Sequence, residues 1–146
     1  MKYKKKISVI GLGYVGLPLA NRLSKYFNVV GFDTNSLRIQ ELKEGIDKNN
    51  DVDKKILVKS KIFFSTNIEE TKKSDFFIVT VPTPVDKRKK PNLKSINTAC
   101  KLVGLNLKKG SIVIFESTVY PGLTEEICKP ILENYSKLSS PKDFGI

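Results

Sequence analysis

The strongest constraint on the fold is the glycine pattern GLGYVG at residues 11–16, which directly follows an apolar run at residues 7–10. The pattern matches G-x-G-x-x-G and predicts a buried strand, a tight turn and a helix. Asp33 stands at the end of the next apolar run, 22 positions after Gly11. A glycine turn of this kind, followed by an acidic residue at about this distance, is typical of dinucleotide-binding folds.

Each residue of the turn has a predicted task. Gly11 permits the tight turn out of the strand, Gly13 lets a pyrophosphate approach the backbone, and Gly16 lets the helix pack closely on the strand. The free amides of Tyr14 and Val15 lie at the positive end of the helix dipole, so we expect them to hold the phosphate charge.

Asp33 predicts which dinucleotide is bound. Its carboxylate can accept hydrogen bonds from both hydroxyls of the adenine ribose, and its charge repels a 2′-phosphate, so we expect NAD rather than NADP. Arg38 is a further candidate cofactor-binding residue, because a nearby arginine can accept that phosphate. The alternative interpretation takes the glycines as packing residues and Asp33 as an ordinary turn residue.

Apolar periodicity predicts alternating strands and helices along the rest of the chain. Strands are predicted at residues 7–10, 28–32, 62–64, 76–81 and 111–115. Helices are predicted at residues 15–27, 35–44, 93–107 and 122–138, with an irregular loop containing a short helix at residues 46–59. This order calls for a parallel sheet covered on both faces, so the expected fold is an α/β, Rossmann-type doubly wound sheet in a single domain over residues 1–146.

Three details of the helices are also predicted. Val15, Leu19, Leu23 and Phe27 recur every four positions and indicate the buried face of the first helix. Asn35 or Ser36 is expected to cap the second helix, and Gly45 to end it. The last helix is expected to be disturbed at Pro130.

The net charge of +11 indicates an anionic partner. Basic runs at residues 4–6 and 87–90 would suit a nucleic acid, but they lack the interleaved aromatic residues that stack on bases. We therefore expect a solvated lysine-rich surface and no nucleic-acid partner. The lysines before residues 7–20 loosely resemble a secretory signal, but the glycine spacing is explained by the dinucleotide turn, and no apolar run approaches the about 20 residues that span a bilayer.

The chain has two cysteines and no histidine, which argues against a disulfide framework and against a metal site. Cys100 and Cys128 fall on the apolar faces of predicted helices, so we expect two buried free thiols. This usage of cysteine is typical of a cytoplasmic protein.

Two loop motifs narrow the family further. Residues 81–86 read VPTPVD and residues 115–122 read FESTVYPG, and each follows the end of a predicted strand. With the PNL of residues 91–93 and the glycine turn, the chain resembles the UDP-sugar 6-dehydrogenases over essentially its whole length. That family contains UDP-glucose dehydrogenase and the UDP-N-acetylhexosamine dehydrogenases of capsule and O-antigen synthesis.

The resemblance implies roles for two threonines. Thr83 and Thr118 would offer hydroxyls to the nicotinamide half of NAD, and Thr118 would also order water as the one catalytic residue of the family carried by this chain. The alternative is that both are ordinary turn residues. Tyr120 and residues 91–93 favour the UDP-N-acetylhexosamine branch over the UDP-glucose branch.

The chain also departs from the family pattern. Relatives oxidise a sugar C6 alcohol to the acid in two hydride transfers and hold the intermediate on a cysteine. Their motif G-x-G-G-x-C does not occur here, and neither Cys100 nor Cys128 has its context. The resemblance therefore implies an NAD-binding domain without the substrate and C-terminal domains, inactive alone, with a UDP-sugar bound only by a full-length and homo-oligomeric enzyme.

Three other functions stay open from the sequence. The chain could be part of a UDP-glucose 6-dehydrogenase, part of another dehydrogenase such as a β-hydroxyacid or 6-phosphogluconate enzyme, or a non-enzymatic module that responds to NAD.

Overall fold

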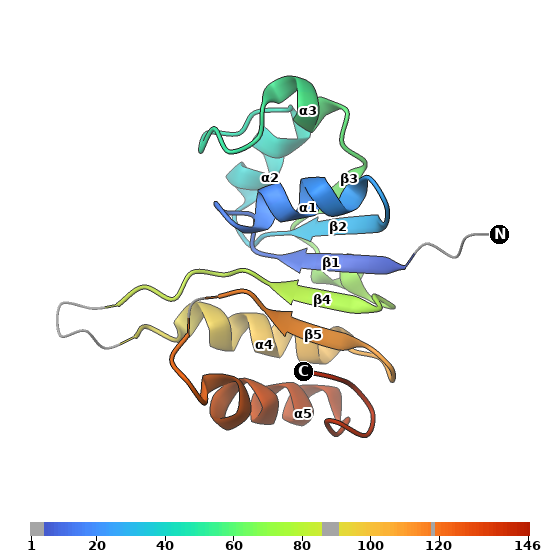
Figure 1. The fold of residues 1–146 in the computed structure, drawn as a ribbon, viewed down its shortest axis with the longest axis vertical. Coiled ribbons are helices and arrows are strands. Elements are labelled where there is room, and N and C mark those ends of the chain that lie inside the picture. Colours follow the sequence, from blue (N-terminus) through green and yellow to red (C-terminus); the bar gives the residue numbers. More distant parts are fainter. Residues whose placement is uncertain (1–4, 86–90, 118) are drawn as a thin grey trace.

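The computed structural model describes residues 5–85, 91–117 and 119–146 (Figure 1). In this part of the chain, five parallel strands form one sheet in the order β3-β2-β1-β4-β5. The strands are β1 (Lys6–Ile10), β2 (Asn28–Phe32), β3 (Ile62–Ser65), β4 (Phe76–Val79) and β5 (Ile112–Phe115). The predicted parallel sheet is confirmed, and β1 lies at its centre.

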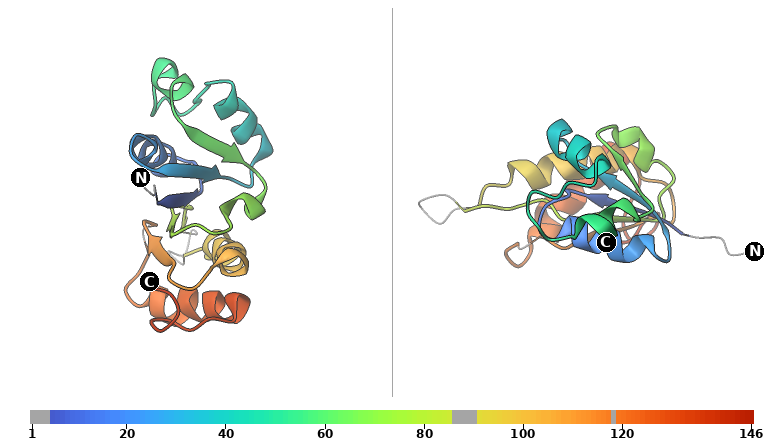
Figure 2. Two further views of the ribbon diagram at one scale, coloured as in Figure 1. Left: turned by 90° about the vertical axis from the view of Figure 1, so that its right-hand side faces the viewer. Right: turned by 90° about the horizontal axis from the view of Figure 1, so that it is seen from above.

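Helices connect the strands and cover both faces. They are α1 (Gly16–Ser24), α2 (Ser36–Lys43), α3 (Lys54–Val58), η1 (Ile68–Thr71), α4 (Lys94–Asn106), η2 (Thr124–Cys128) and α5 (Lys129–Ser136). Helices α1 and α4 lie on opposite faces of the sheet (Figure 2), and α5 packs beside α4. The predicted Rossmann-type doubly wound fold is therefore confirmed. Within the described residues, no helix is long and apolar enough to cross a membrane.

The core consists of two apolar clusters, one on each face of the sheet. Side chains alternate along a strand, so Val9 belongs to the cluster under α1, whereas Ile10 belongs to the cluster under α4. Burial on both faces explains why the strands read as nearly continuous apolar runs.

The buried face of α1 differs from the predicted one. Val15 is 52% exposed, so its place in the predicted stripe was wrong. Leu19, Leu23 and Phe27 are partly buried and pack against the cluster under α1, but they are not its most buried positions. The buried positions are Gly16, Leu17, Ala20 and Ser24. Three of these four are small residues spaced four apart, which lets the helix approach the sheet closely.

Both predicted ends of α2 are confirmed. The side chain of Asn35 caps the helix by accepting a hydrogen bond from the Arg38 amide at 3.1 Å. Gly45 ends it with φ of +75°, a conformation that favours glycine, and the Gly45 amide donates to the Leu42 carbonyl at 3.1 Å.

The disturbance predicted at Pro130 is also confirmed. The turn before it, η2, is π-helical, and Pro130 follows at the second position of α5. Cys128 at the end of η2 and Cys100 of α4 are fully buried free thiols, as predicted. A hydrogen bond between them and burial raise the pKa of Cys100, which makes this thiol a poor nucleophile.

Asp75 ties together the amino-terminal ends of β1, β4 and β5. Its carboxylate accepts a hydrogen bond from the Lys6 amide at 2.9 Å and forms an ion pair with Lys108 at 3.1 Å. The Asp75 carbonyl accepts the amide of Ile112 at 2.9 Å. The Lys6 amide, aided by Lys108 and opposed by partial burial, lowers the pKa of Asp75 below its ordinary value.

We predict that Asp75→Asn lowers the thermal midpoint by a few degrees at neutral pH. Because the pKa of Asp75 is lowered on folding, the stability from its ionised form is present above about pH 4, the ordinary carboxyl value, and is lost as pH falls through the lowered value. The midpoint difference between wild type and variant should therefore be full at pH 7 and should shrink below about pH 4. Circular dichroism melts from pH 7 to pH 2.5 measure this. A difference that stays constant across the range would contradict the assignment, and Asp51→Asn, at an exposed carboxylate, is the control.

Candidate functional site

A pocket of about 520 Å³ opens at the carboxyl ends of the strands. It lies between the glycine turn, the loop after β2, the loop after β4 and the first turns of α4. Its lining includes Gly11, Gly13, Asp33, Arg38, Thr80 and Thr98. Since the chain leaves β1 toward β2 and later returns to β4 on the other side, this is the point at which the strand order reverses, where open α/β sheets bind ligands.

Gly11 and Gly16 of the glycine turn have no room for a side chain. Gly11 has φ of +97°, and its carbonyl accepts the hydroxyl of Thr80 at 2.7 Å. A Cβ added at Gly16 would lie 1.8 Å from the Gly11 carbonyl oxygen and 2.5 Å from Oγ1 of Thr80. The tight turn at Gly11 and the close packing at Gly16 thus follow the steric roles expected of these two glycines.

Gly13 is different from the other two glycines of the turn. A Cβ there would meet no atom within 4 Å, and the residue lines the pocket. The Gly13 carbonyl accepts the Leu17 amide at 3.1 Å in the first turn of α1. Tyr14 and Val15 are 72% and 52% exposed, and their amides lie at the start of α1, where backbone donors lack partners within the helix.

Asp33 is fixed by the backbone while keeping acceptor capacity. Its Oδ2 accepts the Leu12 amide at 2.8 Å, and its Oδ1 accepts the Asn35 amide at 2.9 Å. A carboxylate offers about four acceptor positions, so about two remain for a ligand in the pocket that Asp33 lines. This arrangement fits a pair of neighbouring hydroxyls.

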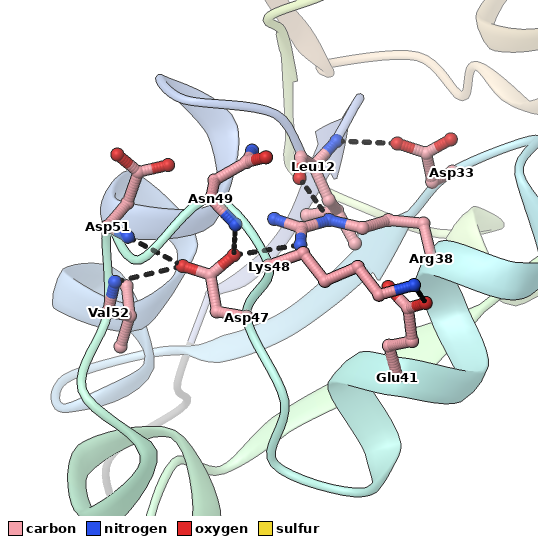
Figure 3. Close-up of polar contacts among 9 residues, drawn as sticks. All are labelled: Leu12, Asp33, Arg38, Glu41, Asp47, Lys48, Asn49, Asp51 and Val52. Carbon is pink, nitrogen blue, oxygen red and sulfur yellow. Dashed lines mark hydrogen bonds and ion pairs between the residues drawn. The ribbon is translucent and has the colours of Figure 1, made fainter.

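Arg38 lies beside Asp33 at the same end of the pocket (Figure 3). Its Nε donates to the Leu12 carbonyl at 3.0 Å, and its Nη1 donates to Asp47 at 2.8 Å. The side chain is only 11% exposed. The guanidinium predicted to contact the cofactor is therefore already paired with a carboxylate of the same chain.

The two loop motifs are joined by a hydrogen bond. The hydroxyl of Ser117 after β5 donates to the Val81 carbonyl after β4 at 2.6 Å. In the described part of the chain, the pocket lining extends along this loop to Pro82, and Thr83 is the next residue. Thr118, together with residues 1–4 and 86–90 of the predicted motifs and basic runs, lies outside the described residues.

Several residues that line the pocket were not predicted from the sequence. Thr80 ends the apolar run of β4, and the α4 residues Lys94, Ser95 and Thr98 form the opposite wall. Thr80 follows a strand and the other three lie on a helix. Their positions in the sequence do not show that they face the pocket, which becomes visible only in the folded chain. Among residues 5–85, 91–117 and 119–146, no group of three His, Cys, Asp or Glu side chains could hold a metal ion.

Comparisons with known proteins agree on one family. Residues 5–146 match the sequence model of the UDP-glucose/GDP-mannose dehydrogenase family, NAD binding domain. The chain is 51% identical over 140 residues to UDP-N-acetyl-D-glucosamine 6-dehydrogenase of Pseudomonas aeruginosa, covering 95% of this chain and 33% of that protein. It is 48% identical over 142 residues to Protein CapL of Staphylococcus aureus, covering 97% and 34%.

A solved structure is also similar to this chain. The UDP-D-ManNAc dehydrogenase of Pyrococcus horikoshii matches with a TM-score of 0.87 at 34% identity, over 95% of this chain and 34% of that one. The chain therefore spans about a third of the length of these relatives.

We predict that the two glycines of the turn differ sharply in their effect on stability. Gly16→Ala places a Cβ against the Gly11 backbone and should lower the free energy of unfolding by about 3 kcal/mol or more, at the upper end of overpacking costs. Gly13→Ala meets no atom and should change it by less than about 1 kcal/mol. Urea unfolding followed by circular dichroism measures both. Equal losses of unfolding free energy in the two variants would contradict the close approach of Gly16 to the Gly11 carbonyl.

Proposed function

Because the chain belongs to the UDP-glucose/GDP-mannose dehydrogenase family, we propose that residues 1–146 form the NAD-binding domain of a nucleotide-sugar 6-dehydrogenase. The observation that carries the proposal is the pocket at the sheet's reversal point, which is lined by Asp33, held by two amides, and by Gly13, whose Cα has open space around it. The family match favours this function over a β-hydroxyacid or 6-phosphogluconate dehydrogenase.

The residues present fit NAD. Asp33 would accept both hydroxyls of the adenine ribose with its remaining lone pairs, and the adenine would lie between the loop after β4 and Thr98 of α4. The pyrophosphate would cross Gly13 and meet the amides of Tyr14 and Val15 at the start of α1. When bound, NAD supplies the hydride acceptor, and this chain's residues bind and orient it.

The nicotinamide half would extend toward the loops after β4 and β5. The Ser117–Val81 hydrogen bond keeps these loops together. We propose that Thr83 and Thr118 offer hydroxyls to this half of the cofactor and that Thr118 also orders water in the complete enzyme.

The reaction proposed for the whole protein is oxidation of the C6 alcohol of a UDP-sugar to a uronic acid. The 51% identity to a UDP-N-acetyl-D-glucosamine 6-dehydrogenase and the sequence around Tyr120 support a UDP-N-acetylhexosamine, with UDP-glucose as the alternative. The likeness to CapL supports a role in making capsule or related polysaccharide precursors. We propose that the nucleophile and the sugar-binding residues lie in segments other than residues 1–146.

The proposal extends to the setting of the enzyme. A cytoplasmic location is supported by the two buried free cysteines. The complete enzyme is proposed to be a homo-oligomer, with NAD and a UDP-sugar as its small-molecule partners.

We predict that Asp33→Ala weakens NADH binding at least about tenfold, because hydrogen bonds from ribose hydroxyls to a charged acceptor are worth about 1.5–3 kcal/mol. Wild-type residues 1–146 should prefer NADH to NADPH, since a 2′-phosphate would stand beside the carboxylate. Fluorescence titration measures both affinities. Asp53→Ala is the matched control, because Asp53 also accepts a backbone amide but does so at the start of α3, away from the pocket. Unchanged NADH affinity in Asp33→Ala would contradict the proposal that Asp33 binds the adenine ribose.

We predict that residues 1–146 alone bind NADH but do not oxidise a UDP-sugar. Hydride transfer needs the alcohol held against the nicotinamide, and the G-x-G-G-x-C nucleophile motif is absent from this sequence. NADH formation is assayed at saturating NAD with UDP-glucose, UDP-N-acetylglucosamine and UDP-N-acetylmannosamine. Measurable turnover would contradict the proposal and would make Cys100→Ser and Cys128→Ser the first variants to test.

A further inference from the structure

The loop between α2 and α3 is organised around one buried carboxylate, that of Asp47, whose side chain is 1% exposed. Its Oδ1 accepts Nη1 of Arg38 at 2.8 Å and the Asn49 amide at 3.2 Å. Its Oδ2 accepts the amides of Asp51 at 2.8 Å and Val52 at 2.9 Å (Figure 3). Four donors therefore converge on the two oxygens of Asp47.

Asp47 is ionised at neutral pH. Burial acts to raise its pKa, but the hydrogen bonds from Arg38 and from the amides of Val52 and Asn49 outweigh burial and lower it. Separating the pair would leave a charge buried without a partner, which is costly. Arg38 is therefore held toward Asp47 when the pocket is empty of ligand.

The network continues to the ribose end of the pocket. Arg38 also donates to the Leu12 carbonyl, and the Leu12 amide donates to Asp33. Arg38 and Asn49 both line the pocket. The loop around Asp47 is thus connected, through Arg38 and Leu12, to the carboxylate proposed to read the ribose.

The ion pair between Arg38 and Asp47 affects the net charge that a ligand meets near Asp33. An arginine fork is the group that recognises a 2′-phosphate on the adenine ribose. Here Nη1 and Nε of Arg38 already donate hydrogen bonds, and Nη2 has no partner among the described residues. The positive charge of Arg38 is balanced by Asp47. A phosphate could use only the remaining Nη2 without displacing a hydrogen bond, and it would meet a guanidinium whose charge Asp47 already offsets. The charge of Asp33 would repel it.

We propose that Asp47 determines the preference for NAD over NADP, as a positioning residue that acts through Arg38. The inference rests on the proposed function, which places the adenine ribose at Asp33. A purely structural role for Asp47 would make a different prediction, because loss of the loop would weaken both dinucleotides by the same factor.

The test is Asp47→Asn in residues 1–146, with NADH and NADPH titrated separately. The change keeps the shape of the side chain and removes its charge, which frees Arg38. The ratio of the Kd for NADPH to the Kd for NADH should fall at least tenfold, mainly through tighter NADPH binding. In Arg38→Gln/Asp47→Asn this gain should disappear, because the freed guanidinium is gone.

Glu41→Gln is the matched control. Glu41 is also a largely buried carboxylate, 11% exposed. It forms an ion pair with Lys48 of the same loop and not with Arg38. This variant should leave the ratio unchanged. Asp47→Ser is titrated in parallel, because its hydroxyl can still accept an amide of the loop if the asparagine variant fails to fold.

The outcomes separate this inference from the proposed function. If Asp33→Ala binds NADH at least about tenfold more weakly than wild type, the assignment of the ribose to Asp33 holds. An unchanged ratio in the Asp47 variants, whether both affinities fall together or neither changes, would then overturn only the role of Asp47. If Asp33→Ala has no effect on NADH binding, the proposed function fails first.

Discussion

The rest of the structure depends on the contact between the bare α-carbon of Gly16 and the carbonyl of Gly11. A side chain at Gly16 would overlap that oxygen, so the start of α1 rests directly on the backbone of the turn. The hydroxyl of Thr80 completes the contact by donating to the same carbonyl, which fixes the end of β4 to the end of β1. Gly11 and Thr80, which line the pocket at this contact, are therefore held by backbone atoms and small side chains.

In the proposed site, two carboxylates are the groups that would discriminate between ligands. A protein with a net charge of +11 attracts any polyanion. Discrimination between one anionic ligand and another must therefore come from well-placed negative groups. Asp33 and Asp47 are both held by backbone amides, so their positions are set during folding and not when a ligand arrives. Preorganised groups of this kind lose little conformational entropy on binding.

Local patterns in the sequence predicted the succession of strands and helices, the glycine turn and the caps of α2, because each depends on residues close together in the chain. The face of α1 was missed because periodicity registers large apolar side chains, whereas Gly16 and Ala20 pack on the sheet by being small. Asp47 bonds amides up to five residues ahead, a local habit of aspartate, but its pairing with Arg38 depends on how the loop returns to α2. The predicted strand at residues 76–81 ends at Val79, since Thr80 turns to bond the glycine loop.

The residues that line the pocket are widely separated in the sequence, and this affects how the domain folds during synthesis. Its residues run from Ile10 to Leu102, and the pairing of β1 with β4 joins Ile7 to Phe76. A growing chain can form the glycine turn and the Asp47 loop early, but it has only half of a binding site until α4 has emerged. Such distant pairings form slowly. The cofactor can therefore stabilise the nearly finished domain by mass action, but it cannot guide the first half of the chain into place during synthesis.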